Sequence, residues 1–394
     1  MEQVLSDVVI ADFTQMMQGG WASQKLGDMG ADVVKIEPPH GEAERRVGFN
    51  GEFTEGWSYG FLAKDRNKRS VALDLKSEEG YAAAVDIVAE ADVVMENFRP
   101  DVMERLGLSY EDVREVNPEV IYVSGSAYGS SGPYADRPGQ DLLYQAMTGL
   151  TTNTGRADDP PTPTGSPIVD GHSATLIALY TMYALYHREL TGEGQKVEAN
   201  LLNSALDFQC NELTYVLNAG EDLERGARNQ GHPMFWSPYG VYETADGYVA
   251  IGMSSLTAVG ETFGIEEFAA YDDDVGDIFQ DRDRIHERIE SHTRTRPSEE
   301  VVEELSAVDV QAVEVADHSD VESNPQIQHN DMILEIDHPE LGSFKTTGFP
   351  VEMSGTEEAV RYPPPSVGEH TAEVLDELGY SDEEIDAVLD ATGN

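Results

Sequence analysis

The residues in this sequence most able to do chemistry are acidic side chains on glycine-flanked loops, and the foremost is Asp170 in the segment SPIVDGHSA. This aspartate follows a short apolar run and precedes a long apolar helical pattern. It could cap that helix by accepting backbone N–H bonds. It could also be a nucleophile, because a carboxylate beside a helix N-terminus and next to a glycine is open to a ligand. Spacing alone leaves both interpretations open.

Motifs for other common chemistries do not occur. No GxGxxG follows a predicted strand, and neither GxxxxGK[ST] nor HExxH is found. The ten histidines form no i+3 or i+4 pairs, and the single cysteine, Cys210, lies in the apolar context LDFQCNEL. We therefore expect no metal centre and no permanently bound cofactor, and we expect Cys210 to be a small buried residue.

Charge is the most unusual bulk property of the chain. The sequence has 75 acidic residues against 25 basic ones, which gives a net charge of −50. Nucleic acids and anionic membranes are therefore poor partners. The acidic residues are interleaved with periodic apolar segments, a pattern typical of a folded protein with a carboxylate-coated surface. Such a surface suits multimolar salt, where repulsion is screened, so we expect the high-salt cytoplasm of a halophile.

The elements that must position Asp170 are strands and helices in alternation. Helical patterns separate five β-rich runs, which are VVIADF (8–13), ADVVKIE (31–37), SVALDL (70–75), ADVVME (91–96) and VIYVSGS (120–126). This succession predicts a doubly wound, Rossmann-like α/β domain with a parallel sheet. Residues 127–170 are rich in turn formers and predict ordered loops, and 173–190 predict a long, largely buried helix ending at TGEG.

Length and composition allow two domains. A chain of 394 residues that is 40% hydrophobic can bury one large core and a second, smaller one. Residues 225–330 contain short strands followed by acidic helices, which predicts a smaller α+β domain. No apolar stretch approaches the length of a membrane span and no signal-peptide pattern opens the chain, so we expect neither membrane insertion nor export by that route.

Five blocks of sequence carry a resemblance to a known family. They are DFTQMMQGGWASQKLGDMGADVVKIEPPHGEAER, NKRSVALDLKSEEG, ENFRPDVMERLGLSYEDVREVNPEVIYVSGSAYGSSGPYADRPGQD, GSPIVDGHSATLIALYTMYALYHRELTGEGQKVEANLLNSAL and SVGEHTAEVLDELGYSDEEI. The sequence resembles the family III CoA-transferases, which include formyl-CoA and carnitine-CoA transferases. The resemblance implies a large domain of residues 1–205 completed by about 335–394, a small domain at 225–330, linkers at 206–224 and about 331–345, and an interlocked homodimer.

The resemblance also implies a covalent mechanism. The family aspartate that matches Asp170 attacks the acyl-CoA thioester, giving an aspartyl anhydride and then an aspartyl-CoA thioester. Gln18 and Asp141 match residues placed beside this nucleophile, although Met17 and Gln18 both fall where relatives carry one glutamine. Backbone N–H groups near Gly171 are candidate oxyanion donors. An anhydride hydrolyses in a wet site, so a closing loop is expected.

CoA carries phosphates, and a chain of net charge −50 must gather its few cations where they bind. Basic residues that include Lys68 and Arg69 fall at strand ends or loops, where an open α/β sheet binds ligands. For any one of them the competing interpretation is a surface salt bridge. By resemblance, the residues expected to bind CoA are Arg45, Lys76, Asn97, Phe98, Arg99, Arg105 and Arg137.

The expected substrates are dicarboxylic. The sequence is similar to family members of halophilic archaea in the methylaspartate cycle, which implies succinyl-CoA as donor and mesaconate, a C4–C5 dicarboxylate, as acceptor. The family's formyl-CoA transferases carry a run of glycines where this chain has NQGHPMFWSPYG, so formate is not the expected acceptor. The candidates for anchoring a distal carboxylate are His40, Arg46, Tyr134 and His232.

Two other functions stay open. The α-methylacyl-CoA racemases share the fold but use a histidine in a loop that reads Gly139, Gln140, Asp141 here. Glutamine cannot act as a general base, which favours the transferase. A catalytically silent CoA-binding subunit would keep the fold without covalent chemistry, and the presence of Asp170 argues against it.

We expect the stability of this protein to depend on salt. Raising KCl shortens the Debye length from about 10 Å at 0.1 M to about 3 Å at 1 M, which screens carboxylate repulsion. The midpoint of thermal unfolding, measured by circular dichroism, should therefore rise steadily with KCl. A midpoint that does not change with salt would contradict this expectation.

Overall fold

The computed structural model describes residues 3–271 and 273–393. Contacts divide the chain into two compact units. The first unit is formed by Met1–Tyr144, Pro167–Phe208 and Pro325–Asn394, and the second by Gln145–Ser166 and Gln209–Asn324. None of the helices in the described residues combines the length and apolarity needed to cross a bilayer.

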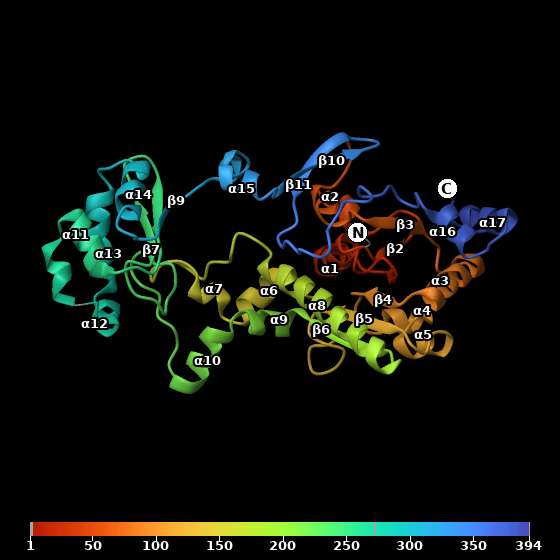
Figure 1. The fold of residues 1–394 in the computed structure, drawn as a ribbon. Helices are drawn as coiled ribbons and strands as arrows, with labels where there is room; N and C mark the ends of the chain where they lie inside the picture. Colours follow the sequence, from red (N-terminus) through yellow and green to blue (C-terminus); the bar gives the residue numbers. More distant parts are fainter. Residues whose placement is uncertain (1–2, 272, 394) are drawn as a thin grey trace. The chain divides into compact units, whose positions relative to one another are not determined.

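The first unit is built on a parallel six-stranded sheet (Figure 1). Its strands are β1 (Val9–Asp12), β2 (Asp32–Glu37), β3 (Lys68–Ala72), β4 (Val93–Glu96), β5 (Ile121–Ser126) and β6 (Gln195–Asn200). Their order is β3-β2-β1-β4-β5-β6, and every neighbouring pair is parallel. This arrangement confirms the predicted α/β class, and its strand order reverses direction between β1 and β4.

Alternate residues along the strands enter two different cores, as the two-residue period of a strand requires. Ile10 and Met95 belong to the core on one face, and Ala11 and Val94 belong to the core on the other. Both faces are therefore covered. The central strands β1 and β4 are mostly apolar, as strands buried on both sides usually are, whereas β2 and β3 also carry buried charged residues. The apolar residues of these runs are what made the strands recognisable in the sequence.

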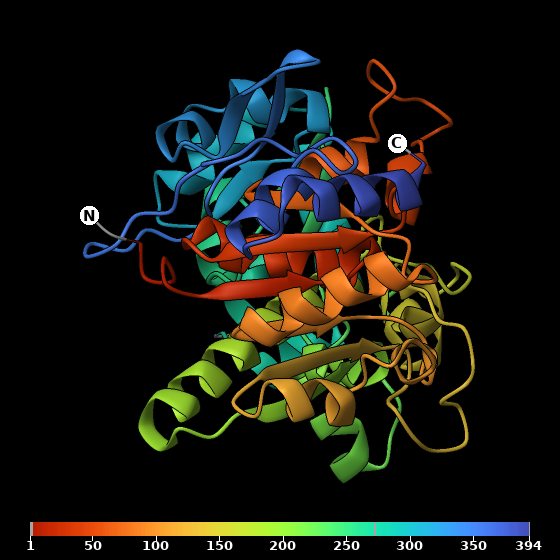
Figure 2. The ribbon, with the colours of Figure 1, turned by 90° about the vertical axis from the view of Figure 1, so that its right-hand side faces the viewer.

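Helices cover the two faces of this sheet. One face packs against α1 (Met16–Asp28) and α8 (Ile168–Thr191). The other packs against α3 (Glu78–Glu90), α5 (Tyr110–Val116), α16 (Thr371–Glu377) and α17 (Asp382–Thr392), and Figure 2 shows the blue C-terminal helices beside the orange α3. The remaining elements of this unit are η1 (Ala43–Arg46), α2 (Tyr59–Lys64), α4 (Val102–Leu106), α6 (Asp141–Met147), which continues into the second unit, α9 (Leu201–Phe208), α15 (Pro325–His329), β10 (Ile333–His338) and β11 (Gly342–Thr347).

The second unit has its own core around an antiparallel sheet in the order β7-β8-β9. Its strands are β7 (Gly240–Glu243), β8 (Tyr248–Ile251) and β9 (Ala312–Glu314). Its helices are α7 (Leu150–Asn153), α10 (Cys210–Ala219), α11 (Leu256–Phe263), η2 (Glu266–Tyr271), α12 (Val275–Gln280), α13 (Arg282–Thr293), α14 (Ser298–Ser306) and η3 (His318–Ser323).

Three local predictions were wrong. Strand β6 was not foreseen, because this edge strand alternates polar residues with few apolar ones. Residues 127–170 are not loops throughout, since they contain α6 and α7. Helix α8 begins at Ile168, five residues before the predicted start, so Asp170 lies within its first turn.

Helix α8 is also less buried than predicted. One face packs into the core through residues such as Ala174 and Ile177. The opposite face exposes five large apolar side chains in this single chain, which are Leu179, Tyr180, Tyr183, Tyr186 and Leu190. Cys210, expected to be buried, is exposed at the start of α10.

A buried network of ion pairs joins β1, β2 and β3. The Lys68 ammonium lies 2.7 Å from Asp65 and 3.3 Å from Asp12, and all three side chains are almost fully buried. Lys35 lies 3.4 Å from Asp65 in the same network. Burial opposes ionisation of Asp65, but Lys68 and Lys35 outweigh it and hold the pKa of this carboxyl below its usual range. Lys68 is therefore a structural cation, not the ligand-binding residue predicted from its place at a strand end.

We expect Lys68→Met to destabilise the fold strongly. Removing Lys68 leaves the buried Asp12 carboxylate without its cation and leaves Asp65 with Lys35 alone, and breaking a buried ion pair in this way costs about 3–5 kcal/mol. Urea unfolding at high KCl measures the free energy of unfolding. The matched control is Lys76→Met, because Lys76 is exposed and its loss should change stability by less than about 0.5 kcal/mol.

Candidate active site

A cavity of about 470 Å³ opens beyond the carboxyl ends of β1, β4 and β5. It lies at the point where the strand order reverses, which is where open α/β sheets bind ligands. Asp170 lines it, together with Gln18, Asn97 and Asp141. We call it the Asp170 cavity. Four side chains that the sequence placed at the site are thus brought together from β1–α1, β4, α6 and α8.

Asp141 performs the capping that the sequence offered to Asp170. Its carboxylate accepts the backbone N–H bonds of Val169 at 2.7 Å and of Asp170 at 3.0 Å, at the start of α8. These N–H groups have no acceptor within the helix, so an external carboxylate satisfies them. The Asp170 side chain is consequently spared that role. Among the described residues no hydrogen bond or ion pair occupies its carboxylate.

The environment of Asp170 favours the protonated acid. Burial is the largest cause, followed by the neighbouring carboxylate of Asp141, and together they raise the pKa of Asp170 from its ordinary value of 3.8 to about 7. Glu44 acts in the same direction, whereas Lys64 opposes it. A carboxylate with few compensating partners is a stronger nucleophile once ionised, because its charge is poorly solvated.

Gly171 has a packing role at the start of α8. A β-carbon at this position would lie 3.0 Å from the Trp21 ring, so glycine lets α8 approach α1 closely. The Gly171 N–H donates to the Pro167 carbonyl inside the first turn of α8 at 3.1 Å. This N–H is therefore already bonded, which argues against its use as an oxyanion donor.

Gln18 is held beside the nucleophile. It is buried in the first turn of α1, and its amide donates to the Ser173 hydroxyl at 3.0 Å. Ser173 lies three residues after Asp170, on the same face of α8. A β-carbon on Gly125 would lie 3.0 Å from the Gln18 carbonyl oxygen, so this glycine leaves room for the amide.

A second cavity of about 500 Å³ lies beyond the carboxyl ends of β1, β2 and β3. We call it the Lys76 cavity. His40 and Arg46 line this cavity with Lys76, and so they are not in the Asp170 cavity where a distal carboxylate was expected. Phe98 lines both cavities. Apolar side chains form much of the Lys76 cavity, including Phe13, Ile36, Leu73, Leu75, Phe98 and Leu106.

The cations that line these cavities have no carboxylate partner within ion-pair distance in the described part of the chain. They are Arg99 and Arg137 in the Asp170 cavity and Arg46 and Lys76 in the Lys76 cavity. Such cations are informative because the chain has three acids for every base, so possible carboxylate partners are plentiful. Two cavities with unpaired cations and one poorly solvated carboxylate suit an anionic ligand that is attacked by Asp170.

Three other predicted cations are used elsewhere. Arg45 donates twice to Glu37, at 2.8 and 2.6 Å, and once to the Pro365 carbonyl, so its guanidinium is committed to the fold. Arg69 pairs with acidic residues of β2 and α16. Arg105 is exposed and pairs with Asp101 at 3.4 Å. Arg45 and Arg69 are corrected to structural roles for this reason.

The last two predicted substrate residues are outside the lining of the Asp170 cavity. The Tyr134 ring stacks against the Arg137 guanidinium at 3.8 Å, so it orients a cation that does line the cavity. His232 belongs to the second unit, where its ring contacts the Glu212 carboxylate at 2.6 Å.

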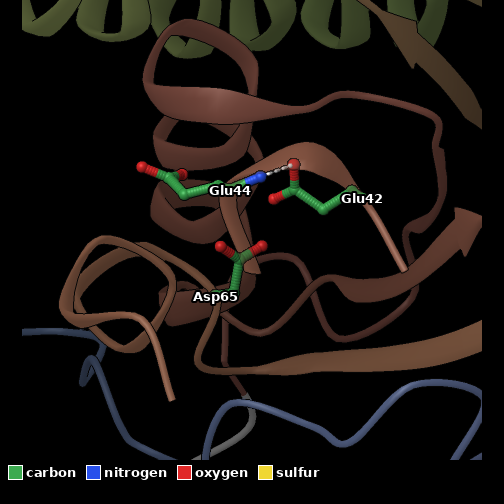
Figure 3. A group of neighbouring side chains, drawn as sticks. All are labelled: Glu42, Glu44 and Asp65. Carbon is green, nitrogen blue, oxygen red and sulfur yellow. Dashed lines mark hydrogen bonds between the residues drawn. The ribbon is translucent and has the colours of Figure 1, made fainter. Parts of the chain in front are cut away.

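A cluster of three buried carboxylates, Glu42, Glu44 and Asp65, has the spacing of a metal site (Figure 3). Their nearest oxygens lie within 4.8 Å of one another. Lysines already neutralise the cluster, however, since Lys64 lies 2.7 Å from Glu44 and Lys35 lies 3.4 Å from Asp65. Ammonium groups therefore take the place that a cation would fill.

Sequence reasoning missed several residues of the site. Met16, Leu142 and Leu201 line the Asp170 cavity, and Ser173 holds Gln18. The signal for Ser173 was available, because a residue at i+3 from the nucleophile shares its helix face. Nothing in the sequence pattern marks the apolar lining.

Comparison with known proteins identifies the family. The model of CoA-transferase family III matches residues 5–371, and the chain belongs to this family. The chain is 34% identical to the succinyl-CoA:mesaconate CoA-transferase of Haloarcula hispanica over 95% of this chain and 96% of that one. It is 30% identical to the succinate–glutarate CoA-transferase of Agrobacterium fabrum, with 95% of each chain covered.

The fold agrees with this assignment. The structure of a CAIB/BAIF family protein from Brucella suis matches with a TM-score of 0.83 and 28% identity, over 96% of this chain and 100% of that one. The chain is therefore a CoA-transferase that acts on CoA thioesters, as the sequence resemblance predicted.

We expect activity to rise with pH through about 7. Asp170 can attack only as the carboxylate, and its pKa is raised to about 7, so the initial rate should fall about tenfold per pH unit below that value and level off above it. The measurement is a pH profile of kcat/KM at high KCl.

Asp141→Asn provides the control for this profile. Asparagine still caps α8 but removes the neighbouring charge, so the midpoint should move to lower pH. A midpoint near 4 in the native enzyme would refute the raised pKa.

Proposed function

We propose that this CoA-transferase moves CoA from succinyl-CoA to a dicarboxylic acid, mesaconate in particular, through covalent intermediates on Asp170. The observation that carries the proposal is an Asp170 carboxylate without hydrogen-bonding partners in the described residues, in a cavity lined by the unpaired cations Arg99 and Arg137. The similarity to the Haloarcula hispanica enzyme supports the choice of substrates.

The proposed reaction proceeds by four acyl transfers. An Asp170 oxygen attacks the thioester carbonyl, the C–S bond breaks, and CoA thiolate leaves behind a mixed anhydride. The thiolate attacks the aspartyl carbonyl, releasing the first acid as its carboxylate and forming an aspartyl-CoA thioester. The second acid attacks this thioester to form a new anhydride and thiolate. Attack of the thiolate on the acid's carbonyl gives the new acyl-CoA and restores the Asp170 carboxylate, with no net proton change.

The two cavities differ in their lining, which suggests that they bind different parts of the substrates. The Lys76 cavity combines apolar walls with Lys76, Arg46 and His40, which suits the adenine ring and phosphates of CoA. The Asp170 cavity holds the thioester and the acid, with Arg99 or Arg137 as the cation for the distal carboxylate. No permanently bound cofactor is required by this chemistry, since the CoA thioester is itself a substrate.

The proposal also covers the domain organisation, the oligomeric state and the cellular environment of the protein. We infer that the second unit is a domain inserted between the parts of the first, and that two chains form an interlocked homodimer. The exposed tyrosines and leucines of α8 support an apolar contact with a partner. The net charge of −50 and the similarity to a Haloarcula enzyme support the salt-rich cytoplasm of a halophile.

The reaction and its nucleophile can be tested together. We expect the native enzyme, at high KCl, to transfer CoA from succinyl-CoA to mesaconate in preference to itaconate, citramalate, malate, formate and carnitine. Asp170→Asn should lower this rate by about 10³-fold or more. Mass spectrometry of quenched native enzyme should show a CoA adduct on the peptide that contains Asp170.

Asp7→Asn is the matched control, because Asp7 is exposed and remote in sequence from the site. Full activity of Asp170→Asn would refute the covalent mechanism. A panel without transfer, together with exchange of the α-hydrogen of a 2-methylacyl-CoA, would favour the racemase. Binding of CoA with neither reaction would favour a silent subunit.

A further inference from the structure

The segment between β1 and α1 is held by side chains. Its residues, 13–15, connect the end of β1 to the helix that carries Gln18. Asp12 accepts the Thr14 N–H at 2.9 Å, and the buried Lys35 donates to the Thr14 carbonyl at 3.1 Å. The backbone of this segment therefore depends on contacts from outside it.

Asn97 binds this segment through two hydrogen bonds to the backbone of Gln15. Its amide oxygen accepts the Gln15 N–H at 2.9 Å, and its amide nitrogen donates to the Gln15 carbonyl at 2.8 Å. A primary amide offers a donor and an acceptor side by side without any change of protonation. Asn97 directly follows β4, the strand next to β1, so the contact bridges the point where the strand order reverses.

The backbone conformation of Met16, the residue after Gln15, explains why these hydrogen bonds are needed. Met16 has a φ of +59°, in the left-handed region that costs a residue with a β-carbon about 1–2 kcal/mol. Its N–H points to the Glu42 carboxylate at 3.4 Å, on the side of the carboxylate cluster drawn in Figure 3. An unfavourable backbone conformation at a site persists only where neighbours impose it. Asn97 on one side and Glu42 on the other are the neighbours in question.

The position of Gln18 depends on these contacts of Asn97 with Gln15 and of Glu42 with Met16. Helix α1 starts at Met16, so the conformation of residues 15 and 16 sets the direction of its first turn. Gln18 then reaches Ser173, one turn from Asp170. Gly19 packs so tightly on Thr14 that a β-carbon would lie 2.3 Å from the Thr14 β-carbon, so a shift of the segment moves the helix start with it.

We propose that Asn97 is a positioning residue, whose side-chain amide fixes the Gln15 peptide and thereby holds Met16, Met17 and Gln18 against the Asp170 cavity. The inference rests on the proposed function and deepens it. It replaces the expectation that the Asn97 amide contacts the nucleotide of CoA. Phe98 and Arg99, the next two residues, keep their place in the cavity lining.

The test compares Asn97→Ala with Asn117→Ala. Asn117 is matched because it is also half-buried and also donates from its amide to backbone carbonyls, those of Val88 and Ala91, away from both cavities. We expect Asn97→Ala to lower kcat for CoA transfer by about 10–100-fold, as a misplacement of about 1 Å does. The KM for succinyl-CoA should stay within about threefold of the native value. Asn117→Ala should leave kcat unchanged.

Hydrogen exchange supplies a readout that does not depend on activity. In the unligated protein, a peptide covering residues 13–17 should exchange faster in Asn97→Ala than in the native chain, while peptides from β1 and β4 stay protected. An unchanged exchange rate, with a KM raised at least about tenfold and a native kcat, would show a direct contact with CoA and overturn the proposal. If the native protein fails to transfer CoA but the exchange result holds, the proposed function fails and the positioning of the segment stands.

Discussion

The scarcity of positive charge constrains everything else in this protein. With 25 bases against 75 acids, every base that neutralises a buried carboxylate is one that the surface then lacks. Lys35, Lys64 and Lys68 are used in this way, because each lies within about 4 Å of a buried carboxylate. Arg99 and Arg137 in one cavity and Arg46 and Lys76 in the other have no carboxylate partner within ion-pair distance among the described residues, which favours an anionic ligand there.

The same electrostatics set up the nucleophile. Asp141 takes over the capping of α8, and its charge then lies next to Asp170, which burial has already made hard to ionise. The first carboxylate is well solvated by N–H groups, and the second is not. Two neighbouring acids thus acquire different roles from their surroundings, as in other enzymes that use a pair of carboxyl groups.

The order of strands decides which segments meet at the site. Because β1 and β4 are neighbours although 80 residues separate them, Asn97 can bond to Gln15 and hold the start of α1. Helix α8, which is much later in the sequence, brings Asp170 to the same cavity and Ser173 to the Gln18 amide. Its outer face remains apolar and exposed in the single chain, which links the site to the proposed dimer.

The sequence by itself determined the parallel α/β sheet, because short β-rich runs alternate with helical patterns along the first part of the chain. It also determined the family and the position of Asp170, since those depend on residues that are contiguous in the chain. The edge strand β6 and the true start of α8 escaped it, because β6 has few apolar residues and α8 begins inside a segment rich in turn-forming residues. Only the tertiary structure decided that Asp141 caps α8, that Arg45 and Lys68 are structural, and that Asn97 holds Gln15. These are contacts between distant segments, and which partner satisfies a charge or an N–H group is settled only when the segments pack together.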